Sequence, residues 1–529
     1  MSIEKFNNLN KELNKKATTW EDINWRDVET DLAARQKGLV VAYNNSEHAR
    51  LKLLQESLLR SFCGRAMAIR KVTQSKGSKT PGVDGKLWKT SKQRFEAIKN
   101  LKRIIFAKSG DYKASGVLRV WIPKEPNSKR PLGIPTLTDR AIQQLFVFIL
   151  DPIVEEKSDL HSYGFRKYRS TNDAMQRLRH LLGPKNRPTW IYDADIKKCF
   201  DMISHEIILS EISKIIPSRR IKFVSQWLKA PIREDGTYIR PKKGTPQGGV
   251  ISPLLSNIVL NGLEQQVRGS VLKSTSRPRE NKLVGNWVIR YADDFLVTSR
   301  SRKQLLEENI PKIKTFLSTR GLIINEEKSK IINLESESFD FLGWNVSLKK
   351  RKRSFNDLSS TDNFVLIIVP TNASIKRVKT RLKEMFKYNN NIKALIGDLN
   401  PLLRGWTNYY RTSYHSQKVF QSLGHYVYEK TRSWLKKKHP RQTVGNINKK
   451  YVFSNSKRTW RFGINEKYVI FDPSQAQQIR FKNLQLGLNP YVNEDYYIQR
   501  TLILDADKFR AAVYSKYNKK CLLCGGSLY

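Results

Sequence analysis

The chain has few of the features that secreted or membrane-spanning proteins need. Its 529 residues include four cysteines. Cys63 and Cys199 each stand alone, which excludes a disulfide framework and predicts a reducing compartment, either the bacterial cytoplasm and nucleoid or an organelle interior. The sequence shows no apolar run of about eighteen residues, so no membrane partner is expected. The first residues, Met1–Lys5, carry an early acid and no apolar core, so neither a secretory signal nor a transit peptide is expected.

Acidic residues are scarce relative to basic ones. The chain has 97 Lys plus Arg against 48 Asp plus Glu, a formal net charge of +49. This excess is spread along most of the length, which indicates a nucleic-acid partner whose phosphates release counterions when they are neutralised. Tyr, Phe and Trp among the basic residues offer stacking surfaces for unpaired bases. A ribosomal structural protein has similar charge but usually lacks this length and apolar fraction, and the length itself predicts several domains.

Two adjacent acids interrupt an apolar segment. Asp293 and Asp294 follow Tyr291-Ala292 and are flanked by the short apolar runs 288–290 and 295–297. The pattern predicts a β-hairpin with an acidic tip. Two like charges in such a place need a cation, and carboxylate oxygens favour Mg²⁺, although Mn²⁺ would also fit. Phosphoryl transfer commonly uses two ions about 3.5–4 Å apart. Taken alone, an exposed Asp-Asp turn explains these four residues equally well.

Two upstream segments strengthen the chemical interpretation. Residues 190–195 predict a strand that ends in acids, so an acid here could face the hairpin across one sheet and three carboxylates could converge on two metal ions. Asp193 and Asp195 share one face by period-two alternation, so spacing alone does not choose between them. Between the acidic segments, Gln247-Gly248-Gly249 forms a turn before a helix beginning at Ser252-Pro253. Such a turn lets the backbone approach a nucleobase or sugar closely.

In this order, the three segments resemble the palm of a reverse transcriptase. From about Trp20 to its C-terminus the chain resembles the group II intron-encoded reverse transcriptases/maturases. The resemblance implies an α+β right-hand polymerase fold with fingers, palm, an α-helical thumb and a small C-terminal DNA-binding region. It also selects Asp195, because the family's acid precedes Ile-Lys and stands five residues before an aromatic, here Phe200.

The resemblance assigns roles around the acids. Asp195 and Asp293 would hold two Mg²⁺ ions with Asp294 in support, one ion activating the primer 3′-hydroxyl and the other binding the triphosphate. No zinc is expected. Two short strands, 118–124 and 129–135, predict a hairpin that resembles the family's fingers. The residues implied at the dNTP are Lys124 and Arg130 at the triphosphate, Phe200 at the sugar, Gln247 and Gly248 at the templating base, and Lys328 as a proton donor. Taken without the resemblance, Phe200 is equally a core aromatic and each cation a surface residue.

Two later segments resemble nucleic-acid-binding parts of the family. Residues 399–411, followed by Trp434, resemble the maturase or thumb domain, in which some of the aromatics pack the core. RNA contacts are implied for Arg404, Arg411, Lys436, Lys437 and Lys438. The patch 457–461 resembles part of the DNA-binding region, with implied DNA contacts at Arg458, Trp460 and Arg461.

The predicted domains follow one another along the chain. They are a helical, RNA-binding N-terminal extension (1–61), fingers and palm (62–347), the thumb or maturase domain (348–450), the DNA-binding region (451–504) and a remnant or start of an HNH endonuclease module (505–529). Cys521 and Cys524 supply two of the four ligands that a structural zinc usually needs. Nicking by that module is therefore not expected of this chain.

The resemblance predicts an RNA-directed DNA polymerase and maturase that binds its own group II intron RNA as a ribonucleoprotein. It would assist splicing and copy the intron into target DNA by target-primed reverse transcription with dNTPs; its oligomeric state is not indicated. The alternative is a splicing-only maturase, against which Asp195, Asp293, Asp294, Gln247 and Lys124 argue together. A reverse transcriptase adapted to defence or diversification is a third option, disfavoured by the segment 399–411.

Overall fold

The computed structural model describes residues 17–107, 112–125, 128–268, 285–350, 363–455 and 458–504. In these ranges the chain is a mixture of helices and mostly antiparallel sheets, which confirms the predicted α+β class. It divides into two compact units. The first unit takes the described parts of Met1–Ser170, Ala194–Lys330 and Leu484–Tyr529, and the second takes those of Thr171–Asp193 and Ile331–Asn483.

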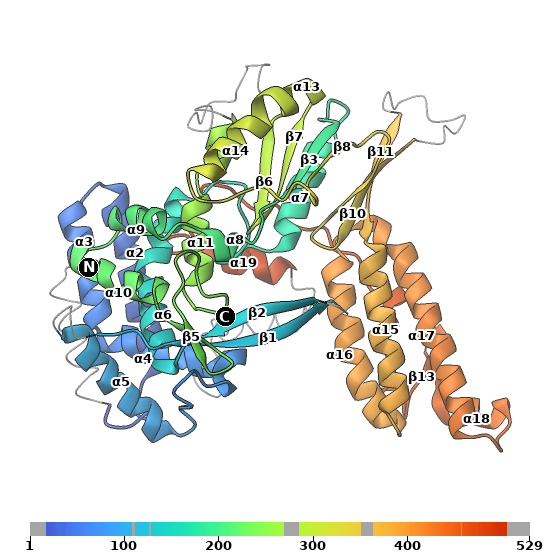
Figure 1. The fold of residues 1–529 in the computed structure, drawn as a ribbon. Coiled ribbons are helices and arrows are strands. Elements are labelled where there is room, and N and C mark those ends of the chain that lie inside the picture. Colours follow the sequence, from blue (N-terminus) through green and yellow to red (C-terminus); the bar gives the residue numbers. More distant parts are fainter. Residues whose placement is uncertain are drawn as a thin grey trace. The chain divides into compact units, whose positions relative to one another are not determined.

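The first unit begins with helices that pack around a buried central helix. These are α2 (Trp25–Asn44), α3 (His48–Arg60), α4 (Phe62–Gln74), a short η1 (Lys76–Lys79), α5 (Ser91–Phe106) and the central α6 (Leu137–Lys157) (Figure 1). Along α3, apolar residues at helical spacing form one buried stripe: Leu51, Leu54, Leu58 and Leu59. Pro152 lies inside α6, where it cannot donate a hydrogen bond to Phe148 four residues earlier. The Phe148 carbonyl instead accepts from Nε2 of Gln36 at 3.1 Å.

Between α5 and α6 the chain forms a long hairpin, which confirms the predicted pair of strands. β1 (Val117–Glu125) and β2 (Ser128–Ile134) pair antiparallel, with Leu118 opposite Ile134 and Ile122 opposite Arg130. β4 (Ile232–Glu234) pairs parallel with β1, and β5 (Thr237–Ile239) completes a sheet of order β2-β1-β4-β5.

The other described elements of the first unit are helices and one hairpin. Its helices are α8 (Cys199–Met202), α9 (His205–Ser213), α10 (Ser218–Leu228), α11 (Ser252–Leu260), α12 (Leu263–Arg268), α13 (Arg302–Gln304), the π-helical turn η3 (Leu305–Asn309), α14 (Ile310–Ser318) and α19 (Glu494–Leu504). The hairpin is β6 (Trp287–Tyr291) with β7 (Asp294–Ser299). The start of α11 at Ser252 confirms the helix predicted there, since Pro253 occupies a first-turn position that needs no amide proton.

The second unit combines short strands with a helical bundle. Its strands are β3 (Trp190–Asp195, whose last two residues belong to the first unit), β8 (Lys330–Asn333), β9 (Phe339–Phe341), β10 (Trp344–Lys350), β11 (Phe364–Pro370), β12 (Val452–Asn455) and β13 (Arg458–Phe462). Its helices are α7 (Thr171–Leu182), α15 (Asn372–Tyr388), α16 (Ile392–Tyr410), η4 (Tyr414–Ser416), α17 (Gln417–Lys438), α18 (Val444–Tyr451) and η5 (Pro473–Gln475). β10 stands between β11 and β9, and β12 pairs with β13.

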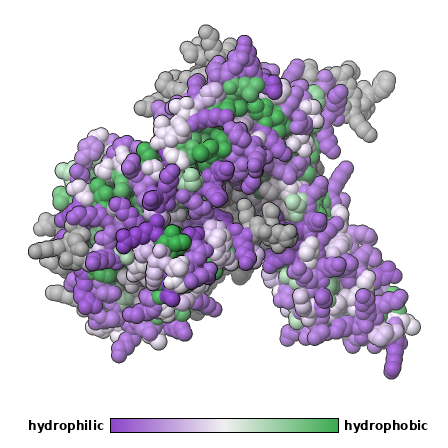
Figure 2. All heavy atoms as spheres, in the orientation of Figure 1, coloured by the Kyte–Doolittle hydropathy of each residue, from purple (hydrophilic) through white to green (hydrophobic). Residues whose placement is uncertain are grey.

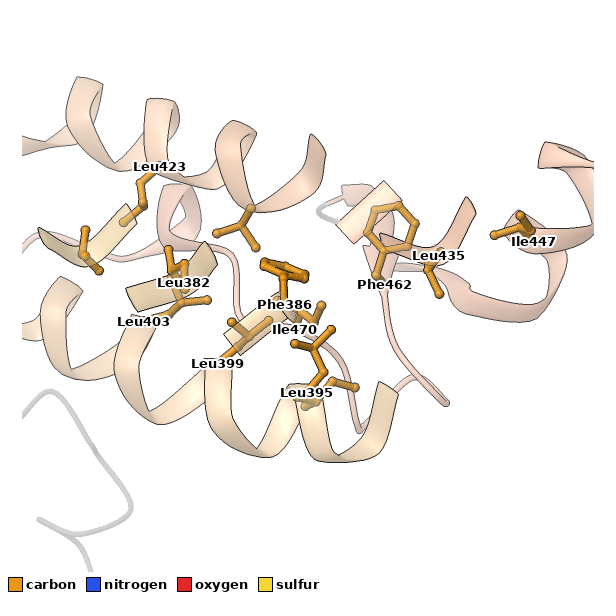
Figure 3. Packing of buried hydrophobic residues seen from close by; sticks show 13 residues of the cluster. Leu382, Phe386, Leu395, Leu399, Leu403, Leu423, Leu435, Ile447, Phe462 and Ile470 are labelled. Atoms are coloured by element: carbon orange, nitrogen blue, oxygen red, sulfur yellow. The ribbon is translucent and has the colours of Figure 1, made fainter. Parts of the chain in front are cut away.

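The bundle has its own hydrophobic core. Figure 3 shows Leu382 and Phe386 of α15 facing Leu395, Leu399 and Leu403 of α16. Ile470 belongs to the same cluster. The helical spacing of apolar residues in 375–404 predicts these two helices, and the structure confirms them.

Hydrophilic residues cover most of the face seen in Figure 2, in keeping with the excess of basic residues. In the described ranges, no helix has both the length and the apolar character needed to span a bilayer. The predicted polar insertion 270–282, the basic run 351–353 and the predicted endonuclease segment 505–529 lie outside the described residues.

Candidate active site

The predicted acidic hairpin tip is present. β6 and β7 pair antiparallel with Tyr291 opposite Asp294, so Ala292 and Asp293 form a two-residue turn. Ala292 has a φ of +61°, a conformation that residues with a side chain rarely adopt. Asp293 is half-buried, whereas Asp294, the first residue of β7, is exposed. The turn therefore places two adjacent carboxylates in different environments.

A buried arginine and a glycine fix the shape of this turn. Nη1 of Arg290 donates to Oδ1 of Asn257 at 3.1 Å and to the carbonyl of Ala292 at 3.2 Å. Burial lowers the pKa of the Arg290 guanidinium to about 10, and the charge of Asp159 opposes that shift. Gly164 approaches the turn so closely that a Cβ atom there would lie 2.4 Å from the Ala292 nitrogen. Only glycine fits at that position without a shift of backbone.

Asp195 lies at the end of β3 among polar neighbours from a later segment. Asp193 and Asp195 are both half-buried and Ala194 between them is buried, as the alternation predicts. Nδ2 of Asn325 donates to Oδ2 of Asp195 at 3.1 Å, and Nζ of Lys328 lies 3.8 Å from the same oxygen. The predicted Lys328 therefore lies beside a candidate acid.

The charges of both candidate acids reach the buried thiol of Cys199. Burial above all, then the negative charge of Asp293 and, less strongly, that of Asp195, raise the pKa of the Cys199 thiol to about 12. The positive charge of Arg290 opposes the shift. Because Coulomb interactions weaken with distance and with screening, both carboxylates must lie close to this buried thiol. The fold thus gathers Asp195 and Asp293 at one place in the first unit.

The Gly-rich turn and the β1–β2 hairpin meet at Gln247. Nε of Arg130 donates to Oε1 of Gln247 at 3.0 Å, and Nε2 of Gln247 donates to Asp201 at 3.4 Å. The amide of Gly133 donates to the Gln247 carbonyl at 2.5 Å. Gly248 has a φ of +112°, and a Cβ atom there would lie 2.7 Å from the Gly133 carbonyl oxygen. Lys124 belongs to β1, but its side chain lies outside the described part of the structure.

Phe200 lies on the short helix α8 and is 8% exposed. Its carbonyl accepts from the amide of Thr245 at 2.6 Å, which ties α8 to the Gly-rich turn. Its ring meets that of Phe165 edge to face, with centroids 6.3 Å apart. The predicted sugar-contacting ring is thus next to the turn that carries Gln247, with a second aromatic beside it.

The donor chemistry of the acids suits a divalent ion. Asp195 and Asp293 offer carboxylate oxygens, the ligands that Mg²⁺ prefers, beside the cationic groups of Lys328 and Arg290. Among the residues that the structure describes, no three acidic, histidine or cysteine side chains form a ready metal-binding group. The roles of Asp195, Asp293 and Asp294 as metal ligands stay predictions.

The predicted nucleic-acid contacts lie mostly on exposed positions of the second unit. Lys436, Lys437 and Lys438 form the exposed last turn of α17. Arg404 is exposed on α16 with its guanidinium 4.6 Å from the centre of the Phe471 ring, and Arg411 follows the end of α16. Arg461 is half-buried on β13. Arg458 and Trp460 belong to the same strand, but their side chains are not among those described. These contacts stay predictions.

Sequence reasoning did not single out several residues that shape the site. Arg290 stands directly before the acidic tip, and a basic residue inside an apolar strand signals a buried partner. Asn325 stands three residues before Lys328, in the segment already chosen for that lysine. Nothing local in the sequence indicates that Asn257 and Gly164 reach the hairpin, because both contacts join distant parts of the chain.

Comparison with known families agrees with this geometry. Residues 122–346 match the model of reverse transcriptase (RNA-dependent DNA polymerase), and residues 20–101 match the N-terminal domain of reverse transcriptase. Residues 375–452 match the group II intron maturase-specific domain. The first match contains every acid and dNTP residue named above, and the last contains α16, α17 and the three lysines.

Related proteins come from bacteria and from yeast. Protein YkfC of Escherichia coli is 33% identical to this chain, over a match that covers 54% of this chain and 81% of YkfC. The group II intron-encoded protein LtrA of Lactococcus lactis is 27% identical, over a match that covers 87% of this chain and 86% of LtrA. A putative COX1/OXI3 intron 1 protein of Saccharomyces cerevisiae is 25% identical over 95% of this chain, which spans 66% of that protein. The site, the domain matches and these relatives together establish that the chain belongs to the family of group II intron-encoded reverse transcriptases/maturases.

Proposed function

We propose that this chain extends a primer along an RNA template with dNTPs, using Asp195 and Asp293 to hold the divalent ions of the reaction. The observation that carries the proposal is the gathering of these two carboxylates around Cys199, with Lys328 and Asn325 at one of them. A bound Mg²⁺ pair supplies activation of the 3′-hydroxyl and charge neutralisation at the triphosphate. Asp294, exposed at the same tip, is the candidate supporting ligand.

The residues around the acids have separate tasks in this proposal. Arg130 binds phosphate oxygens through its planar fork of donors, and its contact with Gln247 aligns that fork beside the templating base. Phe200 limits the space at the sugar, and Gly248 lets the backbone come close to the base pair. Lys328 holds a proton for the leaving pyrophosphate, and its ammonium lies 3.8 Å from the carboxylate of Asp195.

The proposal extends to RNA and DNA partners. The maturase-specific match and the exposed lysines at the end of α17 support binding of the group II intron RNA and assistance to its splicing. Copying that RNA into a DNA target by target-primed reverse transcription would use both the RNA binding and the polymerase activity of one chain. The patch around Arg461 is the candidate contact with target DNA.

Asp293→Asn tests the polymerase directly. The substitution keeps the size of the side chain and removes the charge that a metal ion needs. We expect RNA-templated primer extension to fall by about 10³-fold or more, because metal-bound charge carries much of phosphoryl-transfer catalysis. Single-nucleotide incorporation at saturating dNTP is the measurement.

Asp235→Asn is the matched control. Asp235 is exposed in the turn between β4 and β5 with a φ of +46°, which asparagine accepts readily. It should extend at the wild-type rate. A wild-type chain that binds intron RNA and supports splicing without extending any primer would instead leave a splicing-only maturase.

A further inference from the structure

The last described segment of the chain returns to the first unit. Residues 484–504 belong there, although the sequence predicts them to be part of a DNA-binding region. Residues 489–497 contact α6 and the loop after it, residues 159–169, which we call the support loop.

The segment is anchored on α6 through buried polar contacts. Nδ2 of Asn489, itself buried, donates to the Pro152 carbonyl at 3.1 Å and to Oε1 of Glu156 at 2.9 Å. The hydroxyl of Tyr491 donates to the carboxylate of Asp151. Buried polar groups with satisfied partners fix one arrangement, because any other leaves a donor or acceptor unpaired.

The same segment contacts the support loop through hydrogen bonds and a stacked pair of rings. Oε1 of Glu494 accepts from Nζ of Lys167 at 2.9 Å and from the Tyr168 hydroxyl at 3.0 Å. The Tyr168 ring stacks on the buried ring of Tyr497, with centroids 5.5 Å apart and planes 20° apart. Tyr168 has a φ of +60°. Such a backbone persists only where neighbouring groups hold it, and Glu494 and Tyr497 are among the groups that do so.

The beginning of the support loop contacts the β6–β7 hairpin. The amide of Tyr163 donates to the Arg290 carbonyl at 2.8 Å, and Gly164 lies against the Ala292 backbone. Phe165, with a φ of +61° and 53% of its surface exposed, meets the ring of Phe200. Arg166 ties the loop's middle to Glu155 of α6 through bonds of 2.7 and 2.5 Å.

From these contacts we propose that residues 489–497 are a positioning element of the polymerase site. They hold the support loop, and the support loop sets the position of the Ala292 turn and of the Phe165–Phe200 pair. The inference rests on the proposed polymerase function and adds residues after the maturase domain to it. A phosphate contact explains these side chains less well. Asn489 and Tyr497 are buried, and Glu494 is an acid that would repel a phosphate.

Substitutions at Tyr497 and Glu494 test the proposal in the full-length chain. Tyr497→Leu removes the ring that stacks on Tyr168, while Tyr497→Phe keeps it. The readout is single-turnover incorporation of one dNTP with enzyme in excess over primer–template, which is insensitive to a loss of folded protein. We expect Tyr497→Leu to slow incorporation about tenfold and Glu494→Gln about threefold, since small misplacements of reacting groups are costly in rate.

Gln499→Ala, at an exposed position of the same helix α19, is the control and should match wild type, as should Tyr497→Phe to within about twofold. Amide hydrogen exchange in residues 287–296 gives a readout independent of catalysis. It should quicken in Tyr497→Leu and stay unchanged in Gln499→Ala, because opening of the hairpin frees its amides. Glu494→Gln serves both measurements if Tyr497→Leu does not fold.

Two results would overturn the positioning role while the polymerase proposal stands. One is wild-type incorporation and exchange in Glu494→Gln and Tyr497→Leu. The other is an unchanged rate on a pre-annealed primer with weakened binding to duplex target DNA, which would make the segment a DNA contact. If the wild-type chain itself does not extend, the polymerase proposal fails, and the exchange measurement alone decides whether the segment holds the hairpin.

Discussion

Among the described residues of the first unit, six that carry a side chain have a positive φ, and three of these lie in the support loop or in the turn between β6 and β7. The three are Phe165 and Tyr168 in the support loop and Ala292 in the turn. Such conformations cost about 1–3 kcal/mol each and persist where the surroundings over-determine them. Here those surroundings are Gly164, the buried Arg290 and the ring of Tyr497.

Gly164→Ala tests this tight packing at a single atom. The new Cβ would lie 2.4 Å from the Ala292 nitrogen, so the hairpin or the loop must move. We expect a loss of about 1–3 kcal/mol in the free energy of unfolding, as for other overpacked sites. Primer extension should fall about tenfold or more, because the turn carries Asp293. Denaturant titration and primer extension measure the two effects.

Gly405→Ala provides the comparison. Gly405 lies in α16, and no atom lies within 4 Å of an added Cβ. The change should be neutral or stabilise by up to about 1 kcal/mol, since alanine favours a helix more than glycine does. Equal effects of the two substitutions would show that the contact at Gly164 does not matter.

The sequence predicts residues of the site unevenly, for physical reasons. The acidic tip follows from the apolar runs on either side of it, whereas Lys328 and Arg130 follow from the family resemblance. The structure places each beside another site residue. The choice of Asp195 over Asp193 depends on family resemblance, because alternation puts both on one face. Arg290 and Gly164 depend on long-range contacts, about which a local pattern carries no information.

Elements with strong periodicity are the best predicted. Short strand-like runs on either side of a polar turn predict the β1–β2 and β6–β7 hairpins, and the apolar spacing in 375–404 predicts α15 and α16. The return of residues 489–497 to α6 is not predictable in this way. It depends on partners more than three hundred positions away in sequence, such as Asp151 and Pro152.

Leu399→Ala tests the core of the helical bundle. Leu399 is fully buried in the cluster formed by α15, α16 and α17 (Figure 3). Its truncation should lower the stability of the second unit by about 2–5 kcal/mol, through lost burial and the cavity left behind. Tryptophan fluorescence during denaturation reports on this unit, because Trp406 and Trp434 pack against the cluster.

Lys393→Ala, at an exposed position of the same helix, should change stability by less than about 0.5 kcal/mol. If Leu399→Ala behaved like Lys393→Ala, the cluster would not be the core of the bundle.

In the whole molecule, compact units do not follow the order of the chain. The first unit is left at Ser170, re-entered at Ala194, left again at Lys330 and entered a third time at Leu484. The predicted domains are consecutive, because composition and motifs are read along the sequence. The limits of these domains stay predictions.

The net charge of +49 belongs to the whole molecule as well. It explains affinity for nucleic acid in general and selects neither a template nor an intron RNA. Selection must come from particular surfaces, and the exposed lysines at the end of α17 are the candidates in the second unit.

The most direct test of the central claim is the Mg²⁺ dependence of single-dNTP incorporation on an RNA template, comparing wild type with Asp195→Asn. We expect incorporation by the wild type to rise with Mg²⁺ and to stop when the ion is chelated. In Asp195→Asn we expect a loss of about 10³-fold or more at every Mg²⁺ concentration. Incorporation by Asp195→Asn at the wild-type rate, or by wild type without a divalent ion, would contradict the central claim.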